Sequence, residues 1–222
     1  MTDESPTVFL VDDDPGVLRA LTRLLRAAGR QVRAFGSSQD FLAAHDPAMP
    51  GCVVLDLSMP GLSGLELQTA LEESGCRRPI IFVSGHGDIP SSVRAMKAGA
   101  VDFLTKPVCA EDLLAAVERA IRQDDLMRRS RAELQVIGER LNTLTPRERE
   151  VLQHVVAGQL NKQIAADLGT VEKTIKVHRS RVMGKMGVRS VADLVRLAER
   201  MGIAAVMEQA DSPIPGEDAQ LR

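Results

Sequence analysis

The fold of this chain is decided by the stretch CVVLDLSMPG at residues 52–61. Four apolar residues directly before Asp56 predict a strand that is buried on both faces. The proline and glycine that follow end this strand. In an open α/β sheet, ligands bind outside the carboxyl ends of the strands, so a carboxylate in this place indicates a chemical task. The plainer alternative is that Asp56 only caps the next turn.

Strands and helices alternate on both sides of this stretch, through the first 122 residues. Apolar runs predict further strands at residues 8–11, 79–83 and 101–104, and residues 31–35 predict a weaker strand. Amphipathic or capped segments predict helices that begin at Pro15, Ser37, Gly64, Pro90 and Glu111. Five strand–helix units predict an α/β fold: a five-stranded parallel sheet, doubly wound, with helices on both faces.

Polar side chains follow four of these strands, at the point where each strand ends. They are Asp12 and Asp13, Asp56, Ser84 and Lys106. The carboxyl ends of parallel strands meet at one edge of a sheet, so these groups are expected to face one crevice. Three carboxylates repel each other there and require a cation, most simply Mg²⁺. A lysine and a hydroxyl beside a metal-bound carboxylate suit phosphoryl transfer to a carboxylate oxygen.

Charge divides the chain into unequal parts. Residues 1–122 carry 12 basic and 16 acidic side chains, a net charge of −4, whereas residues 143–202 carry 11 basic and 6 acidic, a net charge of +5. Residues 203–222 carry 1 basic and 4 acidic side chains, a net charge of −3. An acidic part joined to a basic part suggests two tasks, with the basic part meeting a polyanion.

The basic part has a helical pattern throughout. Helices are predicted at residues 146–157, 161–168 and 172–186, and from Ser190 through about Met201. A short helix, a turn at residues 169–171 and a longer basic helix are typical of a helix-turn-helix reader of DNA. The tail at residues 203–222 is rich in proline and acidic residues and is predicted to be disordered.

Residues 123–142 are predicted to form a helical linker between the two parts. Leu134, Ile137, Leu141 and Leu144 follow a 3-4-3 spacing in and just after it. Such a stripe indicates either a short coiled coil between two chains or a helix that packs on its own domains.

Composition excludes several other classes of protein. The chain has five Phe and no Trp or Tyr, which argues against platforms that stack single-stranded nucleic acid. Its three cysteines, Cys52, Cys76 and Cys109, lack metal-ligand spacing and suggest reduced thiols in the cytoplasm. The acidic, polar first residues predict no signal peptide, and no apolar run is long enough for a membrane span.

Residues 7–122 resemble a response-regulator receiver domain. The resemblance rests on VDDD at 11–14, VLDLSMPG at 54–61, VSGHGD at 83–88 and AGAVDFLTKP at 98–107. It implies that Asp56 accepts a phosphoryl group from a sensor histidine kinase. It implies a Mg²⁺ site in which Asp13 is a direct ligand, Asp12 lies near, and Asp56 and the Ser58 carbonyl complete the protein ligands.

The same resemblance implies roles for residues around the site. Ser84 is expected to be the switch hydroxyl, in place of the commoner Thr, and Lys106 the phosphate-binding lysine, with a cis Lys106–Pro107 bond. Phe103 matches the aromatic residue that moves inward on activation, although an ordinary core position is the alternative. His86 is expected at the mouth of the site, where it could influence hydrolysis or could be a solvated loop residue.

Residues 143–202 resemble a LuxR-type DNA-binding domain. This second resemblance rests on LTPREREVL at 144–152, NKQIA at 161–165 and TIKVHR at 174–179, with Ile175 in place of the commoner Val. By family analogy, the predicted base contacts are Lys176, Val177 and Ser180. The predicted phosphate contacts are Lys162, Lys173, Thr174, Arg179 and Arg181. His178 is expected to pack or cap, with a base contact as the alternative. Glu148 and Glu150 are expected to serve the helix amino end and the core of the domain.

Together the two parts resemble a NarL/FixJ family response regulator, nearest the FixJ and StyR branch. The implied domains are a flavodoxin-like receiver at 1–122, a linker at 123–142, a four-helix DNA-binding domain at 143–202 and a tail at 203–222. Phosphorylation is expected to pair two receivers through a face that includes Ile89, Val93, Met96, Lys97 and Asp102. The homodimer would bind promoter DNA in the cytoplasm, with RNA polymerase as a candidate partner, and would catalyse only its own phosphorylation and dephosphorylation.

Two rival interpretations remain at the level of sequence. In a haloacid-dehalogenase-type phosphatase, Asp12 would be the nucleophile and Asp14 the acid, but this leaves Asp56 and the basic part unexplained. In a constitutive DNA-binding protein, the receiver would have lost its function, against which the complete acidic set argues.

Overall fold

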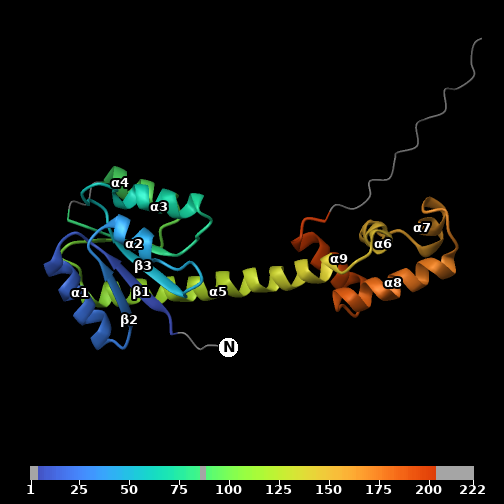
Figure 1. Cartoon of the computed structure of the whole chain (residues 1–222), viewed down its shortest axis with the longest axis horizontal. Helices are drawn as coiled ribbons and strands as arrows, with labels where there is room; N and C mark the ends of the chain where they lie inside the picture. Colours follow the sequence, from blue (N-terminus) through green and yellow to red (C-terminus); the bar gives the residue numbers. More distant parts are fainter. Residues whose placement is uncertain (1–4, 86–88, 204–222) are drawn as a thin grey trace, which may run out of the picture. The chain divides into compact units, whose positions relative to one another are not determined.

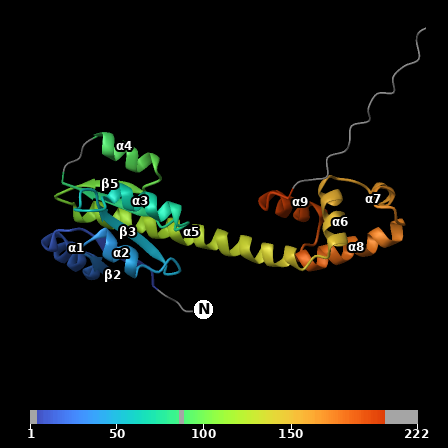
Figure 2. The same cartoon turned by 45° about the horizontal axis from the view of Figure 1, so that its top comes forward.

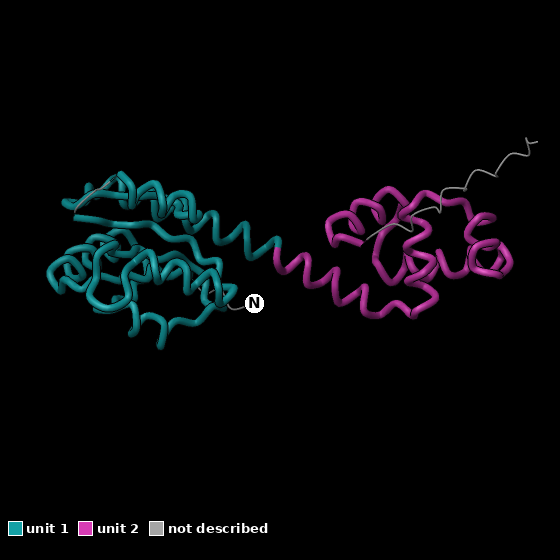
Figure 3. The backbone as a smooth tube through the Cα atoms, turned by 90° about the horizontal axis from the view of Figure 1, so that it is seen from above, with its two compact units in different colours: residues 1–130 teal, residues 131–222 magenta. Residues whose placement is uncertain are grey.

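The computed structural model describes residues 5–85 and 89–203 of the chain. The chain divides into two compact units, Met1–Ser130 and Arg131–Arg222 (Figure 3). His86 and nearly all of the predicted tail lie outside the described residues. Within the described part, none of the helices combines the length and apolar character that crossing a membrane requires.

The first unit is a five-stranded parallel sheet, as predicted (Figure 1). Its strands are β1 (Thr7–Val11), β2 (Gln31–Phe35), β3 (Gly51–Asp56), β4 (Ile80–Ser84) and β5 (Asp102–Thr105), in the spatial order β2-β1-β3-β4-β5. The helices between them are α1 (Pro15–Ala27), α2 (Ser38–Ala44), α3 (Gly64–Glu73) and α4 (Ile89–Lys97). The strand and helix boundaries lie within about two residues of the predicted ones, the usual variation of helix and strand ends.

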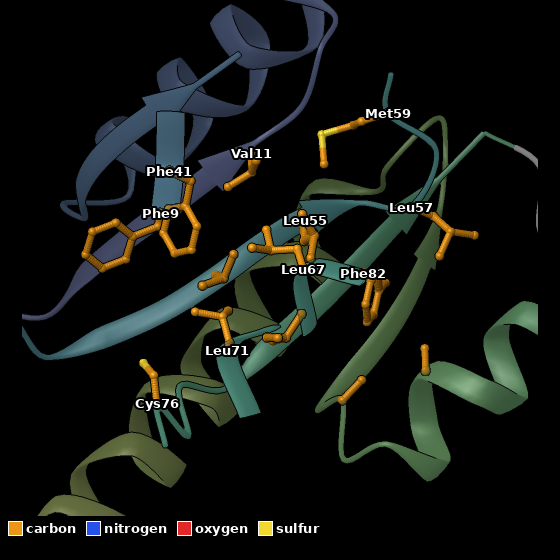
Figure 4. Packing of buried hydrophobic residues seen from close by; sticks show 14 residues of the cluster. Phe9, Val11, Phe41, Leu55, Leu57, Met59, Leu67, Leu71, Cys76 and Phe82 are labelled. Carbon is orange, nitrogen blue, oxygen red and sulfur yellow. The ribbon is translucent and has the colours of Figure 1, made fainter. Parts of the chain in front are cut away.

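Helices cover both faces of this sheet, which is why its strands are apolar runs and not alternating patterns. Alternate strand residues such as Phe9, Leu55 and Phe82 pack with α2, α3 and α4 on one face (Figure 4). The intervening residues, such as Leu10 and Val54, pack with α1 and α5 on the other face. Figure 2 shows the same layering of helices around the sheet from a second direction.

One helix, α5 (Ala110–Asn142), runs from the first unit into the second. It includes both the last predicted helix of the receiver and the predicted helical linker. Asp124 is buried on α5, where it accepts hydrogen bonds from the Gly51 amide at 2.8 Å and from Arg128 at 2.7 Å. Arg128 also donates to the carbonyls of the loop before β3, those of Pro47, Ala48 and Met49. The stretch around residues 124–128 is therefore held firmly to the sheet of the first unit.

The second unit consists of the end of α5 and four helices. These are α6 (Pro146–Val156), α7 (Asn161–Asp167), α8 (Glu172–Met186) and α9 (Val191–Arg200). Thr145 and Glu148 form the predicted capping box at the start of α6. Ile137 and Leu144 are buried in the core of this unit and Leu141 packs against it. Three of the four residues of the 3-4-3 stripe therefore pack within the unit, which agrees with the second of its two interpretations, whereas Leu134 is half-buried outside this cluster.

Candidate functional site

Three predicted site residues meet at the carboxyl edge of the sheet. The ammonium of Lys106 lies 2.7 Å from Asp12 Oδ2 and 2.8 Å from Asp56 Oδ1. Both carboxylates are almost fully buried, with 3% of Asp12 and 5% of Asp56 exposed. Parallel pairing of β1 with β3 and of β3 with β4 brings their ends to the same edge, where Lys106 follows β5. Groups 50 to 94 positions apart in the chain are therefore in direct contact.

Backbone contacts fix the orientation of these side chains. Asp12 Oδ1 accepts the Asp14 amide at 2.9 Å, and Asp56 Oδ2 accepts the Ser58 amide at 2.9 Å. The Lys106 amide donates to the Ser84 carbonyl at 2.8 Å, which places this lysine beside the end of β4. The Lys106–Pro107 peptide bond is cis, which confirms that prediction.

The site carries more negative than positive charge. Burial raises the pKa of the Asp56 carboxyl above its usual range, and the neighbouring Asp12 charge adds to this, while hydrogen bonding to Lys106 opposes it. Burial by itself lowers the pKa of Lys106, but its contacts with Asp12 and Asp56 outweigh that effect and raise it. Two carboxylates face one ammonium, so an additional cation would be favourable here.

The donor set fits a hard cation, although the structure does not assemble it completely. Asp13 is exposed at the start of the loop after β1, next to the buried Asp12. Ser58 lies beside Asp56, which accepts its amide. Among the described residues, no three His, Cys, Asp or Glu side chains are grouped as a metal site. What fits Mg²⁺ is the unbalanced charge and the all-oxygen chemistry of Asp12, Asp13, Asp56 and Ser58.

Gly64 is also part of this site. The sequence predicts that α3 begins here, but it does not predict how closely Gly64 approaches Asp56. A Cβ atom at position 64 would lie 2.4 Å from the Asp56 carbonyl oxygen and 3.0 Å from the Phe82 ring. Only glycine allows the start of α3 to approach the end of β3 this closely. A side chain there would displace the backbone of Asp56.

The two predicted switch residues lie on neighbouring strands. Ser84 is buried at the end of β4, which pairs with β5. Phe103 on β5 is half-buried, and its ring centroid lies 6.3 Å from that of Phe82. Phe103 is therefore at the margin of the core. This position is compatible both with an aromatic residue that moves on activation and with an ordinary core residue.

An apolar surface lies beside Phe103, on α4. The side chains of Ile89, Val93 and Met96 are 77%, 43% and 46% exposed. Lys97 is exposed next to them, and Asp102 forms an ion pair with Arg119 of α5. We call Ile89, Val93, Met96, Lys97 and Asp102 the α4–β5 face.

In the second unit, α7 and α8 form the predicted helix-turn-helix, with the turn at Gly169 in a left-handed conformation (φ 60°). Lys162, Lys173, Ser180 and Arg181 are exposed, and these three cations have no acidic partner in the described part of the chain. Val177 is 45% exposed on α8, which also carries Lys173, Ser180 and Arg181, whereas Lys162 is on α7. A row of unpaired cations beside an exposed valine is the surface expected of a helix that enters the major groove.

Other residues of α8 serve the fold as well. Lys185 donates to the buried Glu148 at 2.6 Å, so its charge is used within the unit. Arg179 donates to Asn161 Oδ1 at 2.8 Å, and Lys176 pairs with Glu172 at 3.1 Å. Thr174 is half-buried, as is His178, whose Nδ1 atom is buried and has no hydrogen-bond partner among the described residues. The structure thus places His178 as a packed residue, in agreement with the packing or capping role expected for it.

Comparison with known proteins matches both parts of the chain. The response regulator receiver domain matches residues 8–118, and the luxR family of bacterial regulatory proteins matches residues 142–198. Nodulation protein W of Bradyrhizobium diazoefficiens is 48% identical over 198 residues, which cover 89% of this chain and 87% of that protein. Transcriptional regulatory protein TdiR of Thauera aromatica is 43% identical over 215 residues, covering 97% and 94%.

Solved structures of whole response regulators are also similar. The response regulator StyR has a TM-score of 0.79 and 46% sequence identity, covering 88% of this chain and 99% of that one. Full-length FixJ from B. japonicum has a TM-score of 0.55 and 43% identity, covering 89% and 98%. The chain is thus a DNA-binding transcription factor of a two-component system and not an enzyme with a separate substrate. It belongs to the response regulators that join a receiver domain to a LuxR-type helix-turn-helix domain, close to FixJ and StyR.

Proposed function

We propose that Asp56 of this chain accepts a phosphoryl group from a cognate sensor histidine kinase. The contact that supports this most directly is the Lys106 ammonium within 2.8 Å of both Asp12 and Asp56. An oxygen of Asp56 would attack phosphorus as the bond to the kinase histidine breaks. Lys106 and the Ser84 hydroxyl would then hold phosphoryl oxygens.

The proposed metal is Mg²⁺, held by Asp12, Asp13, Asp56 and the Ser58 carbonyl. When bound, it would offset the negative charge that the phosphoryl group brings. Lys106 already neutralises one of the two buried carboxylates, so a divalent ion would leave the site able to accept an anion.

Phosphorylation would act on the α4–β5 face through Ser84 and Phe103. Ser84 would engage the phosphoryl group, and Phe103 would move from the margin of the core toward Phe82. Exposed Ile89, Val93 and Met96 supply the apolar area that a pair of receivers would bury. Couplings between sites are typically about 1–3 kcal/mol, so the unphosphorylated protein should retain some dimer.

Pairing of the receivers would bring two DNA-binding domains to half-sites about one helical turn apart in promoter DNA. The proposed base contacts are Lys176, Val177 and Ser180. Lys162, Lys173, Thr174, Arg179 and Arg181 would contact phosphates. The domains proposed for this function are the receiver at residues 1–122, the linker at 123–142 and the DNA-binding domain at 143–202. RNA polymerase is proposed as a further partner. The proposed location is the cytoplasm.

The test is the response of Asp56→Asn to a phosphate mimic. The unchanged protein with beryllofluoride and Mg²⁺ should shift toward dimer in sizing by light scattering, and Asp56→Asn should not shift yet should keep weak DNA binding. Asp46→Asn, an exposed aspartate in the loop before β3, is the matched control and should respond like the unchanged protein. A mimic-driven dimer that persists in Asp56→Asn would refute the assignment.

A further inference from the structure

One edge of the receiver, formed by α1 and β2, carries a concentrated positive charge. Residues 15–39 contain five arginines and neither a lysine nor an acidic residue, whereas the rest of residues 1–122 has 7 basic and 16 acidic side chains. We call these five residues the arginine edge: Arg19, Arg23, Arg26, Arg30 and Arg33. A local charge of +5 in a domain of net charge −4 is not used by the proposed phosphorylation chemistry.

Three of these arginines form a row along α1. Arg19, Arg23 and Arg26 follow each other at positions i, i+4 and i+7, so they share one face of the helix. The row is about 10 Å long, at the rise per residue of an α-helix. All three are exposed, as is Arg33 on β2, and Arg30 between the two elements is half-buried.

The charges of the arginine edge are available to an anion from solvent. Among the described residues, none of the five lies within ion-pair distance of a carboxylate. Asp14, the acid that precedes α1, is instead the N-cap of this helix. Arg26 donates one long hydrogen bond, of 3.4 Å, to the Val32 carbonyl, and Arg33 lies 5.7 Å from the centre of the Phe35 ring.

An open groove of about 680 Å³ lies along the row. Besides the three arginines, its wall consists of small or apolar side chains, and no acid in the described part of the chain lines it. These side chains are Leu18, Thr22 and Ala27 of α1 and Ala34 of β2. Side chains this short allow a bulky polyanion to approach the guanidinium groups closely.

The arginine edge is remote from the other surfaces to which a task is proposed. β2 and β5 are the opposite edges of the sheet, so the arginines lie on the far side of the receiver from the α4–β5 face (Figure 1). α1 begins at the phosphorylation edge, and Arg26 and Arg30 lie toward its other end. Two receivers that pair through the α4–β5 face would both leave their arginines accessible.

We propose that the arginine edge binds the phosphate backbone of duplex DNA, without sequence preference and outside the base pairs that the helix-turn-helix contacts. Arginine forks match phosphate oxygens in bidentate geometry. Duplex DNA carries one negative charge per about 1.7 Å of its axis, so a row of about 10 Å faces several phosphates.

DNA is favoured over an acidic protein because the second unit of the same chain binds DNA. The continuous helix α5 tethers the receiver to that unit, which raises the concentration of phosphates that the receiver meets. This role does not depend on phosphorylation of Asp56, so its failure would leave the proposed switch unaffected.

The test is the salt dependence of DNA binding by the full chain. Fluorescence anisotropy is measured on duplexes of unrelated sequence, one of about 12 base pairs, which the helix-turn-helix alone would occupy, and one of about 40. In Arg23→Gln/Arg26→Gln, the slope of log K against log salt should fall by about 2 on the longer duplex, one for each lost phosphate contact, and should not change on the shorter duplex.

The matched control is Arg77→Gln/Arg122→Gln, which removes the same charge from two exposed arginines of the receiver outside the arginine edge. Both of its slopes should equal those of the unchanged protein. An unchanged slope in Arg23→Gln/Arg26→Gln, or an equal loss in the control, would overturn the proposal. An unchanged slope together with polyglutamate binding that this variant loses would assign the edge to an acidic polypeptide instead.

Photocrosslinking locates the contact directly. In a Cys109→Ser background, Ala27→Cys places an exposed thiol in the groove, and Ala98→Cys places one just after α4, near the other edge of the sheet. With an azidophenacyl group attached, Ala27→Cys should crosslink to the longer duplex and should lose most of this product when Arg23→Gln/Arg26→Gln is added. Crosslinks from neither thiol, or from both equally, would contradict a DNA contact at this edge.

Discussion

Lys106 is the residue that keeps two buried carboxylates together in the receiver. Without its ammonium, Asp12 and Asp56 would face each other as like charges in a desolvated site. Asp14, two positions from Asp12, has a separate role, because its carboxylate accepts the amides of Gly16 and Val17 as the N-cap of α1. The alternative in which Asp14 is the acid of a phosphatase is therefore wrong on two counts, its capping contact and the family of the chain.

Glu148 permits a residue-level prediction of pH dependence. The hydrogen bond from Lys185, with one from the Thr145 amide, lowers the pKa of Glu148 below its ordinary value of 4.5. A carboxyl with a lowered pKa stabilises the fold above that ordinary value and loses the effect as the pH falls through the lowered one. Glu148→Gln should thus reduce the free energy of unfolding by roughly 1.5–3 kcal/mol at neutral pH, as for a charged hydrogen bond.

Calorimetric unfolding of the second unit at several pH values measures this effect. The difference between Glu148→Gln and the unchanged protein should shrink as the pH falls below 4.5, where the unfolded carboxyl is protonated. Glu150→Gln is the matched control, because Glu150 forms an exposed ion pair with Arg147. Its cost should stay under about 1 kcal/mol. Equal costs for the two variants would contradict the buried-pair argument.

At the scale of elements, the central strands β1, β3 and β4 are predictable because burial on both faces leaves an almost continuous apolar run. Their parallel pairing then predicts that Asp12, Asp56 and Lys106 meet. The partners of Lys185 and Arg128 are not predictable in this way. Lys185 reaches Glu148 across 37 positions and Arg128 reaches the loop before β3 across about 80, and neither contact leaves a periodic trace in the sequence. From the sequence alone, Lys185 therefore cannot be distinguished from the other surface charges of the basic helix.

The Asp124–Arg128 pair gives an element-level prediction for α5. Arg128→Met removes the guanidinium that donates hydrogen bonds to the buried Asp124 carboxylate and to three carbonyls of the loop before β3. The expected cost is about 2–3 kcal/mol, with faster amide exchange at residues 45–51 and 122–130. Arg129→Met is the control, since its i,i+4 pair with Asp125 is exposed. Unchanged exchange in Arg128→Met would mean that packing alone holds this part of α5.

A second element-level prediction concerns α8. Lys173→Ala should weaken binding to specific and unrelated duplexes alike and should reduce the slope of log K against log salt by about 1, as one phosphate contact is lost. Val177→Ser should leave the slope unchanged and reduce the preference for the specific duplex. Fluorescence anisotropy over a salt series measures both. Arg196→Ala on α9, paired with Asp193, is the control, and a slope change as large there would argue against the assigned face.

At the scale of the whole molecule, the regulation proposed above depends on the α4–β5 face. Val93→Asp places a charge among Ile89, Val93 and Met96 and should prevent dimerisation with beryllofluoride and Mg²⁺ while Asp56 is still phosphorylated by a small phosphodonor. Light scattering and Phos-tag electrophoresis report the two outcomes separately. Leu126→Asp, at a leucine of α5 that is 67% exposed outside this face, is the control. Dimerisation lost in Leu126→Asp and retained in Val93→Asp would place the interface on α5.

The continuity of α5 limits how this protein can be cut into fragments. A receiver fragment that stops at residue 122 would omit Asp124 and leave the Gly51 amide at the start of β3 without its acceptor. A DNA-binding fragment that starts at residue 143 would omit Ile137, a buried side chain of its core. Fragment expression should therefore divide α5 after Ser130 and before Glu133, so that Arg128 stays with the receiver and both Ile137 and the Glu133–Arg200 ion pair stay with the DNA-binding unit.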